Sequence, residues 1–329
     1  MPLIPLDLPA GIYRNGTDLQ SQGRWRDSNL VRWHDGTMQP IQGWRLRSDT
    51  ATLDITRSLN AWLDNSDNRW IAAGTYRKLY IYDVNSALFD ITPTGLTAGT
   101  ETSIDSTAFG GGVFGSDGYG EPRLERSTGN PATTWSLDTF GQNLVACSTS
   151  DGKIYEWTLN TGTIAAQVTN APVGNTGIMV TDERFLFALG AAGNPRKVQW
   201  CDRENNTLWT PAATNEAGSI ELQTVGRIQC GVKVQNQALI LTTTDAHTAT
   251  YSGPPYVYGI ERVGTSCGIV SAQGVSVVDA GAFWMGKESF FMYSGGTVKE
   301  LESDVADYVY SDINVSQMAK VVAVSNAKF

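Results

Sequence analysis

Short apolar runs recur along the middle of the chain, and each recurrence has the same form. A turn residue is followed by a basic or small polar residue, and then by an apolar stretch that ends in an aromatic side chain. These runs lie at 76–83, 151–157, 195–202, 245–251 and 286–293. Because short apolar runs between turn residues are typical of strands, each of them predicts a β-strand.

A second apolar run precedes each predicted strand, and a third often follows it. The preceding runs lie at 70–73, 144–147, 185–189, 238–241 and 282–285, and the following runs lie at 88–91, 256–260 and 297–301. Short strands joined in this way by turns form an antiparallel meander. The pattern therefore predicts a small sheet that repeats along the chain.

The spacing of the closing aromatic residues gives the size of the repeat. These residues are Tyr82, Trp157, Trp200, Tyr251 and Tyr293. The last four are 43, 51 and 42 residues apart, and propeller repeats run at about 40–50 residues. One such sheet cannot bury both faces, so neighbouring sheets must stack. We predict an all-β fold, a β-propeller-like array of antiparallel meander blades over residues 55–302, with an irregular pair of β-sandwiches as the alternative.

One long interval interrupts the repeat. Tyr82 and Trp157 are 75 residues apart, and the excess falls at 93–134, which is rich in Gly, Ser and Thr. Such a composition favours turns over packed strands. We expect an inserted loop outside the blades there.

The end of the sequence, residues 303–329, has a different pattern. Ser303 and Asp304 are typical N-cap residues, and apolar residues follow them at helical spacing, so a short helix is expected. Residues 321–324 predict the first strand of a further blade. This strand has no partner strands after it, so either the N-terminal segment closes the ring or the chain is part of a longer protein, and we favour the second interpretation.

Composition narrows the possible functions. The chain has 34 glycines and 17% charged residues. Its formal net charge of −9 makes it unsuited to wrapping DNA, because the phosphates are negatively charged. No stretch approaches the roughly 20 apolar residues of a membrane span. The cysteines are predicted to be buried free thiols, and they are Cys147, Cys201, Cys230 and Cys267.

Residues for catalysis are scarce. The chain has only two histidines, His34 and His247, so few residues could serve as the base of a Ser-His-Asp triad. No Cys or His pair has the spacing of metal ligands. Residues 110–115 fit the letter of G-x-G-x-x-G without the strand and helix that a dinucleotide site needs. We expect no enzyme activity, no metal and no cofactor.

The densest group of distinctive residues lies in the segment 1–54, which is predicted to be an N-terminal anchor with a hairpin. Trp and Arg dominate interface hot spots, so we predict that five of these residues support a subunit or adaptor contact. They are Arg24, Trp25, Arg32, Trp33 and Trp44. The alternatives are an ordinary hairpin packed on the blades and, less favoured because nearby Asp residues offset the charge, single-stranded nucleic acid binding.

Residues 11–44 resemble the start of the tail nozzle or tail hub (packaged-DNA stabilisation-like) proteins of short-tailed bacteriophages, and residues 302–327 resemble an internal segment of the same family. The resemblance implies a propeller with an added platform. It also implies a ring of six copies below the portal and adaptor proteins, through which genome DNA passes and on which tail fibres or spikes sit.

Two classes of function follow. The first is a virion structural protein, made in the host cytoplasm, that forms a DNA conduit; an acidic lumen would let DNA slide without sticking. The alternative is a propeller-fold glycosidase or carbohydrate-binding protein that acts on surface polysaccharide. A glycosidase would need paired carboxylates from different blades.

Overall fold

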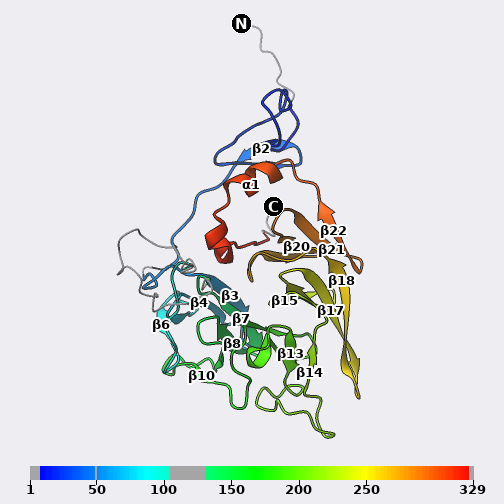
Figure 1. Ribbon diagram of the computed structural model, residues 1–329. Helices are drawn as coiled ribbons and strands as arrows, with labels where there is room; N and C mark the ends of the chain where they lie inside the picture. Colours follow the sequence, from blue (N-terminus) through cyan, green and yellow to red (C-terminus); the bar gives the residue numbers. More distant parts are fainter. Residues whose placement is uncertain (1–7, 49, 104–130, 326–329) are drawn as a thin grey trace, which may run out of the picture.

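The computed structural model describes residues 8–48, 50–103 and 131–325. Their strands form five antiparallel sheets of four strands and one two-stranded hairpin. Each four-stranded sheet is one blade, and the blades follow one another in an arc (Figure 1). Within each blade the strands pair in sequence order. The prediction of an all-β, propeller-like array of meander blades is therefore confirmed.

Each blade takes four consecutive strands of the chain. Blade 1 contains β3 (Ser58–Leu63), β4 (Arg69–Gly74), β5 (Leu79–Tyr82) and β6 (Leu88–Asp90). Blade 2 contains β7 (Trp135–Phe140), β8 (Asn143–Ser148), β9 (Ile154–Trp157) and β10 (Ala166–Gln167). Blade 3 contains β11 (Gly177–Val180), β12 (Leu186–Leu189), β13 (Lys197–Trp200) and β14 (Gly218–Glu221), with the short 3-10 helix η1 (Ala191–Gly193) after β12. Blade 4 contains β15 (Ile228–Val234), β16 (Gln237–Thr242), β17 (Asp245–Gly253) and β18 (Val257–Thr265). Blade 5 contains β19 (Val275–Val278), β20 (Gly281–Met285), β21 (Phe290–Ser294) and β22 (Thr297–Leu301).

The aromatic residues that define the sequence repeat occupy equivalent places. All five lie on the third strand of their own blade, at or near its end, and they are Tyr82, Trp157, Trp200, Tyr251 and Tyr293. Two of these side chains form hydrogen bonds to the segment that connects the third strand to the fourth. Trp157 Nε1 donates to the carbonyl of Asn160 at 3.1 Å, and Trp200 Nε1 donates to the carbonyl of Glu216 at 2.8 Å. The aromatic pattern is thus explained by packing together with a hydrogen bond to the next turn.

Each pair of consecutive blades shares a separate hydrophobic core. Between blades 3 and 4, the ring of Tyr258 meets Phe187 and Trp200 with centroids 4.8 and 5.4 Å apart. The second strands are covered on both faces, and β12 is buried at every position. Burial on both faces explains why these strands are continuous apolar runs in the sequence.

The first strands line the axis, and hydrogen bonds from their side chains join neighbouring blades. The Oγ of Ser58 on β3 donates to the carbonyl of Trp135 on β7 at 2.7 Å. One blade further, Ser136 Oγ donates to the carbonyl of Ile178 on β11 at 2.7 Å. Because each bond joins the beginnings of two first strands, β3, β7 and β11 start at the same rim.

The predicted insertion at 93–134 lies between β6 and β7. Residues 104–130 lie outside the described part of the chain, and the described ends of the insertion are joined to each other. Thr133 N donates to the carbonyl of Thr100 at 2.9 Å, and Thr100 N donates to Thr133 Oγ1 at 2.9 Å. The two ends of the insertion thus meet at its base.

The short helix near the C-terminus is present as α1 (Ala306–Asp312), followed by the 3-10 helix η2 (Val315–Lys320). The predicted side-chain cap is wrong, because the N-cap residue is Val305 and no side chain of Ser303 or Asp304 caps the helix. The predicted strand at 321–324 is also not formed. Its backbone has no neighbouring strand in the described chain; Ala323 N donates to the carbonyl of Gln273, and a loop alone provides no ladder.

All four cysteines are buried free thiols, as predicted. Burial raises the pKa of Cys201 and of Cys230 to about 12. A thiol is nucleophilic only as the thiolate, so these side chains act as small apolar groups in the cores between blades.

In the turn between β3 and β4, several hydrogen bonds converge on the carboxylate of Asp64. Trp70 Nε1 donates to Asp64 Oδ2 at 3.0 Å, and Asn68 N donates to Oδ1 at 3.0 Å. These bonds, with that of Trp70 the largest contribution, lower the pKa of Asp64 to about 2. Since the folded pKa lies below the unfolded value of 3.8, the bonds stabilise the fold fully above that pH, and their contribution is lost as the pH falls through about 2.

We expect the carboxyl carbon of Asp64 to titrate near pH 2 in an NMR pH series. Replacement Trp70→Phe keeps the ring but removes the N–H donor, and it should move the titration midpoint toward 3.8. An unchanged midpoint in this variant would show that the indole does not hold the carboxylate.

Candidate functional site

The predicted anchor folds into a small unit, which we call the N-terminal module (residues 8–47). It contains the hairpin of β1 (Val31–His34) and β2 (Thr37–Pro40) and sits on α1, above blade 5 (Figure 1). The turn between the strands has φ of 49° at Asp35 and 75° at Gly36. Positive φ at both central residues matches the twist of a two-residue hairpin.

Asn15 fastens the module to the beginning of α1. Its Nδ2 donates to the carbonyl of Ser303 at 2.7 Å, and its Oδ1 accepts from Asp307 N at 3.2 Å. The main-chain N–H groups of Arg14 and Asn15 both donate to the carbonyl of Asp304, at 2.8 and 3.1 Å. Asn15 therefore satisfies an N–H group in the first turn of α1 that no local side chain caps.

Two arginines reinforce this attachment. The guanidinium of Arg14 lies 3.7 Å from the ring centre of Tyr308 on α1. Arg24 forms an ion pair with Asp304 at 3.6 Å. Because both partners of the ion pair are largely exposed, it is worth only about 0–1 kcal/mol. Hydrogen bonds to the main chain therefore dominate the attachment.

Three of the other predicted contact residues pack within the module. The rings of Trp25 and Trp33 are 6.4 Å apart and partly buried. Arg32 and Gln39 are paired across the hairpin, and Arg32 NH2 donates to Gln39 Oε1 at 3.4 Å. These contacts hold the hairpin together and leave less of each side chain for a partner.

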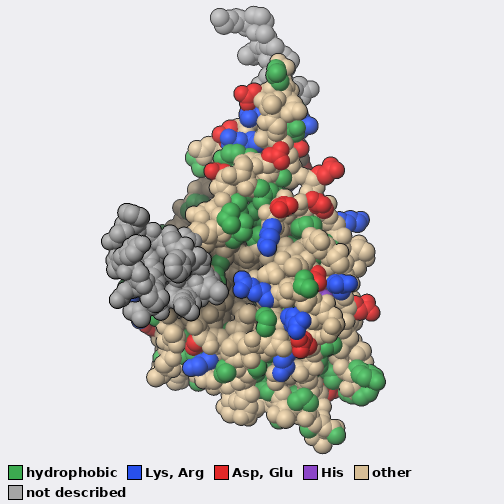
Figure 2. Space-filling model, in the orientation of Figure 1, with side chains coloured by type: hydrophobic (Ala, Val, Ile, Leu, Met, Phe, Trp, Pro, Cys, Tyr) green, Lys and Arg blue, Asp and Glu red, His purple; other side chains and the backbone are tan. Residues whose placement is uncertain are grey.

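Trp44 differs from the other four candidates. Its side chain is 100% exposed, and Leu46 beside it is 81% exposed. Every residue from 41 to 47 is exposed, including Arg45 and Arg47. We call residues 41–47 the exposed segment. In the space-filling view, hydrophobic side chains also gather just below the module, over the region of α1 (Figure 2). Trp44 is thus the predicted contact residue that is most available to a partner.

Replacing Asn15 by alanine should loosen the module while the blades stay folded. The variant loses both side-chain bonds to the start of α1, and removing a cap of this kind costs about 1 kcal/mol. We expect roughly fivefold faster hydrogen exchange at the Asp307 amide, which is that free energy expressed as an opening equilibrium. Asn65→Ala, in an exposed turn of blade 1, is the control and should leave this amide unchanged. Equal hydrogen exchange at the Asp307 amide in the two variants would show that the Asn15 side chain does not hold the module on α1.

The module was predicted from the sequence, but its attachment to α1 was not. Asn15 and Asp307 are 292 positions apart, and nothing in the local pattern links them. The indirect signal was that both ends of the sequence carried the same family resemblance.

The space at the axis is a cavity of about 540 Å³ lined by the first strands and by residues 322–324. Arg57 is the one charged residue among the described residues that line it. The paired carboxylates that a glycosidase needs are therefore absent from the described residues that line this axial cavity. The described residues also hold no group of three or more His, Cys, Asp or Glu able to bind a metal ion.

None of the described helices has the length and apolar character needed to cross a bilayer.

Comparison with known proteins supports no family assignment. No family model and no curated protein matches the chain. Among solved structures, a streptogramin B lyase is 10% identical with a TM-score of 0.43, covering 77% of this chain and 70% of its own. The virginiamycin B lyase of Staphylococcus aureus, solved as an inactive variant with quinupristin, is 8% identical with a TM-score of 0.38, covering 76% and 85%. BBS1N, solved in complex with ARL6DN, is 15% identical with a TM-score of 0.43, covering 81% and 72%. At these scores the likenesses carry no argument about activity.

Proposed function

We propose that this chain is a virion structural protein, the nozzle or hub subunit of a short-tailed bacteriophage. In this proposal it forms a ring below the portal and adaptor proteins, conducts genome DNA, and seats receptor-binding fibres or spikes. Its role is then structural and not catalytic. The ring of six copies and the adaptor partner come from the family resemblance of residues 11–44 and 302–327.

The observation that carries the proposal is the union of these two segments. They lie at opposite ends of the sequence, yet Asn15 and Arg14 bind directly to Ser303, Asp304 and Tyr308. The two segments therefore meet in one structural unit, which is formed by the N-terminal module and α1. That unit presents the exposed segment, whose Trp44 and Leu46 contact solvent at a cost in free energy that a partner's surface would remove.

Charge is compatible with a conduit. The net charge of −9 disfavours tight binding of DNA, because affinity for phosphates depends on clustered Lys and Arg. DNA would pass such a ring without being held by it. In this proposal the chain is made in the host cytoplasm and ends in the phage tail.

The test is the assembly of Trp44→Ala. A buried Trp at the centre of an interface contributes about 2 kcal/mol or more, so self-association should weaken by roughly thirtyfold or more. Native mass spectrometry and sedimentation measure the assembled fraction. Tyr256→Ala is the matched control, because Tyr256 is another aromatic residue with 81% exposure, at the turn between β17 and β18.

The expected result is loss of assembly in Trp44→Ala and normal assembly in Tyr256→Ala. The Trp44→Ala variant should fold normally, because the fully exposed side chain of Trp44 packs against none of the described residues. Normal assembly of Trp44→Ala would show that the exposed segment is not the contact.

A further inference from the structure

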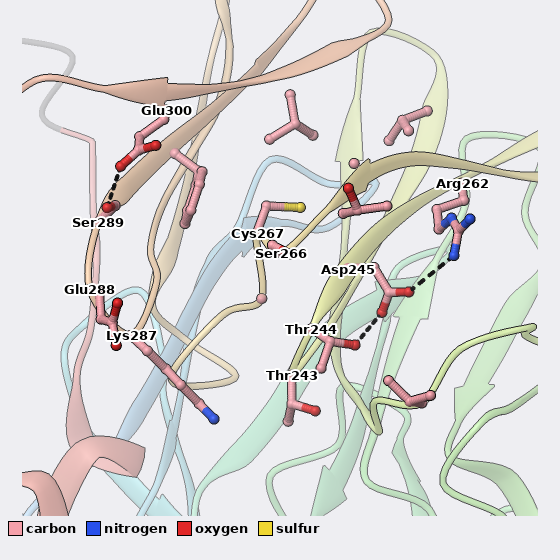
Figure 3. Close-up of a pocket in the computed structure, with 17 residues that line it drawn as sticks. Thr243, Thr244, Asp245, Arg262, Ser266, Cys267, Lys287, Glu288, Ser289 and Glu300 are labelled. Carbon is pink, nitrogen blue, oxygen red and sulfur yellow. Dashed lines mark hydrogen bonds and ion pairs between the residues drawn. The ribbon is translucent and has the colours of Figure 1, made fainter.

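A large cleft opens between blades 4 and 5, at the rim where the first strands begin. Its volume is about 1040 Å³. Figure 3 shows two walls that face each other, with Asp245 and Arg262 on one side and Lys287, Glu288 and Glu300 on the other. The first wall comes from β17, β18 and the turn before them, and the second comes from β21, β22 and the turn before β21. Both donors and acceptors of hydrogen bonds therefore converge on one space.

Asp245 is the most elaborately supported residue of this cleft. Its side chain is only 7% exposed, and its Oδ1 accepts the hydroxyls of Thr224, Thr242 and Thr244 at 2.5, 2.6 and 2.5 Å. Burial raises the pKa of Asp245, but these three bonds more than offset it, and the pKa lies below its usual value. The carboxylate is therefore ionised at neutral pH and fixed in one orientation.

Only one oxygen of Asp245 is used in this way. The bond from Thr224 ties the linker between blades 3 and 4 to β17, and those from Thr242 and Thr244 hold the turn between β16 and β17, which is a sufficient structural role for Oδ1. Oδ2 lies 3.7 Å from His247 Nε2 and 4.0 Å from Arg262 NH1, both longer than a hydrogen bond. His247 is 4% exposed, and its Nε2 is buried without a hydrogen-bond partner among the described residues. A fixed acceptor and an unsatisfied imidazole nitrogen thus face each other beside the cleft.

The opposite wall adds groups that are free to bind. Lys287 and Glu288 form no ion pair with another described residue, and Ser289 donates its hydroxyl to Glu300. Phe291 supplies an apolar surface, and it is stacked on Trp284 with ring centroids 5.9 Å apart. This wall therefore combines polar side chains with a ring that is held in place from behind.

We propose that this cleft binds a neutral sugar. Its lining carries two cations and three carboxylates, a net charge of −1, which disfavours phosphate and other anions. Carboxylates accept, and an arginine donates, two hydrogen bonds in a plane, which suits neighbouring hydroxyl groups on a sugar ring. The apolar face of the ring would lie on Phe291. The inference goes beyond the proposed structural function and does not depend on it.

The experiment uses the full chain and an array of neutral and anionic oligosaccharides, with saturation-transfer NMR on each glycan that binds. We expect saturable binding to at least one neutral glycan. Glu288→Gln and Arg262→Gln should each weaken it tenfold or more while the fold is unchanged, because both side chains are exposed. Glu261→Gln is the control, since Glu261 is the neighbour of Arg262 on β18 and lies outside the cleft lining.

Each outcome decides the proposal. Binding of a neutral glycan that is lost in both cleft variants and kept in Glu261→Gln supports it. No binding on the array, binding confined to anionic glycans, or binding that survives both cleft variants overturns it. Soluble oligosaccharides and intact polysaccharide on whole cells, compared in parallel, separate a free sugar from a cell-surface source.

Discussion

Replacing Trp135 by alanine is expected to lower the free energy of unfolding by about 3–5 kcal/mol, the cost of truncating a buried aromatic residue. Trp135 begins β7 and is 2% exposed. Its indole Nε1 donates to the carbonyl of Thr75 in blade 1 at 2.6 Å. The variant leaves both a cavity between blades 1 and 2 and an unpaired carbonyl in blade 1.

Three parts of the chain meet at Trp135, which is why the effect should be large. Its main-chain N–H donates to Ser58 Oγ at 3.0 Å, and its carbonyl accepts from Gln273 Nε2 at 3.0 Å. Gln273 precedes blade 5, so this point links blades 1, 2 and 5. The side chain also fills the space beside Gly74, where an added Cβ would lie 2.4 Å from the indole.

Urea denaturation measures the loss, with Trp135→Phe as the comparison. Phenylalanine keeps most of the packing but not the N–H donor, so it should cost about 1–3 kcal/mol, the penalty for an unsatisfied buried carbonyl. A loss below about 1 kcal/mol for Trp135→Ala would mean that blades 1 and 2 do not depend on this contact.

The second large effect is expected for Gly268→Ala. The added Cβ would lie 2.0 Å from the carbonyl oxygen of Thr243 and 2.5 Å from Thr244 N, and both are main-chain atoms that cannot rotate away. The residues on either side, Cys267 and Ile269, donate main-chain hydrogen bonds to this same stretch of blade 4 at 3.0 Å. Relief of the clash must move the linker that leads to blade 5 away from blade 4 and stretch these bonds.

We expect Gly268→Ala to cost about 3 kcal/mol, the upper end of the range for overpacking, as measured by thermal and urea unfolding. Gly259→Ala is the control, because a Cβ there meets nothing within 4 Å and the backbone needs no positive φ. It should change stability by less than about 0.5 kcal/mol, as surface substitutions do. Equal stability of the two variants would contradict the close approach at residue 268.

The sequence revealed the second and third strands of the blades better than the first strands and the fourth strands of blades 2 and 3. Trp157 and Trp200 were found because a large aromatic residue closes the third strand in each repeat, and the second strands because both of their faces are buried. The first strands were missed. Their contacts across the axis use Ser58 and Ser136, and Gly231 on β15 lies against Met179, so small and polar residues interrupt the apolar runs of these three strands.

The candidate site shows a similar division. Composition indicated the Trp and Arg residues of the module, but it could not separate Trp44, which is exposed, from Trp25 and Trp33, which pack on each other. That distinction depends on how the hairpin folds. The cleft between blades 4 and 5 was missed because Asp245 and Glu288 come from different blades, and only the stacking of those blades brings them to one space.

The most direct test of the proposed ring is the native assembly of the wild-type chain, measured by native mass spectrometry and by particle imaging of the same sample. We expect closed rings of one symmetry, with the exposed segment and its Trp44 at the contact between subunits. A single species of 35.6 kDa at every protein concentration, with and without the adaptor protein, would contradict it.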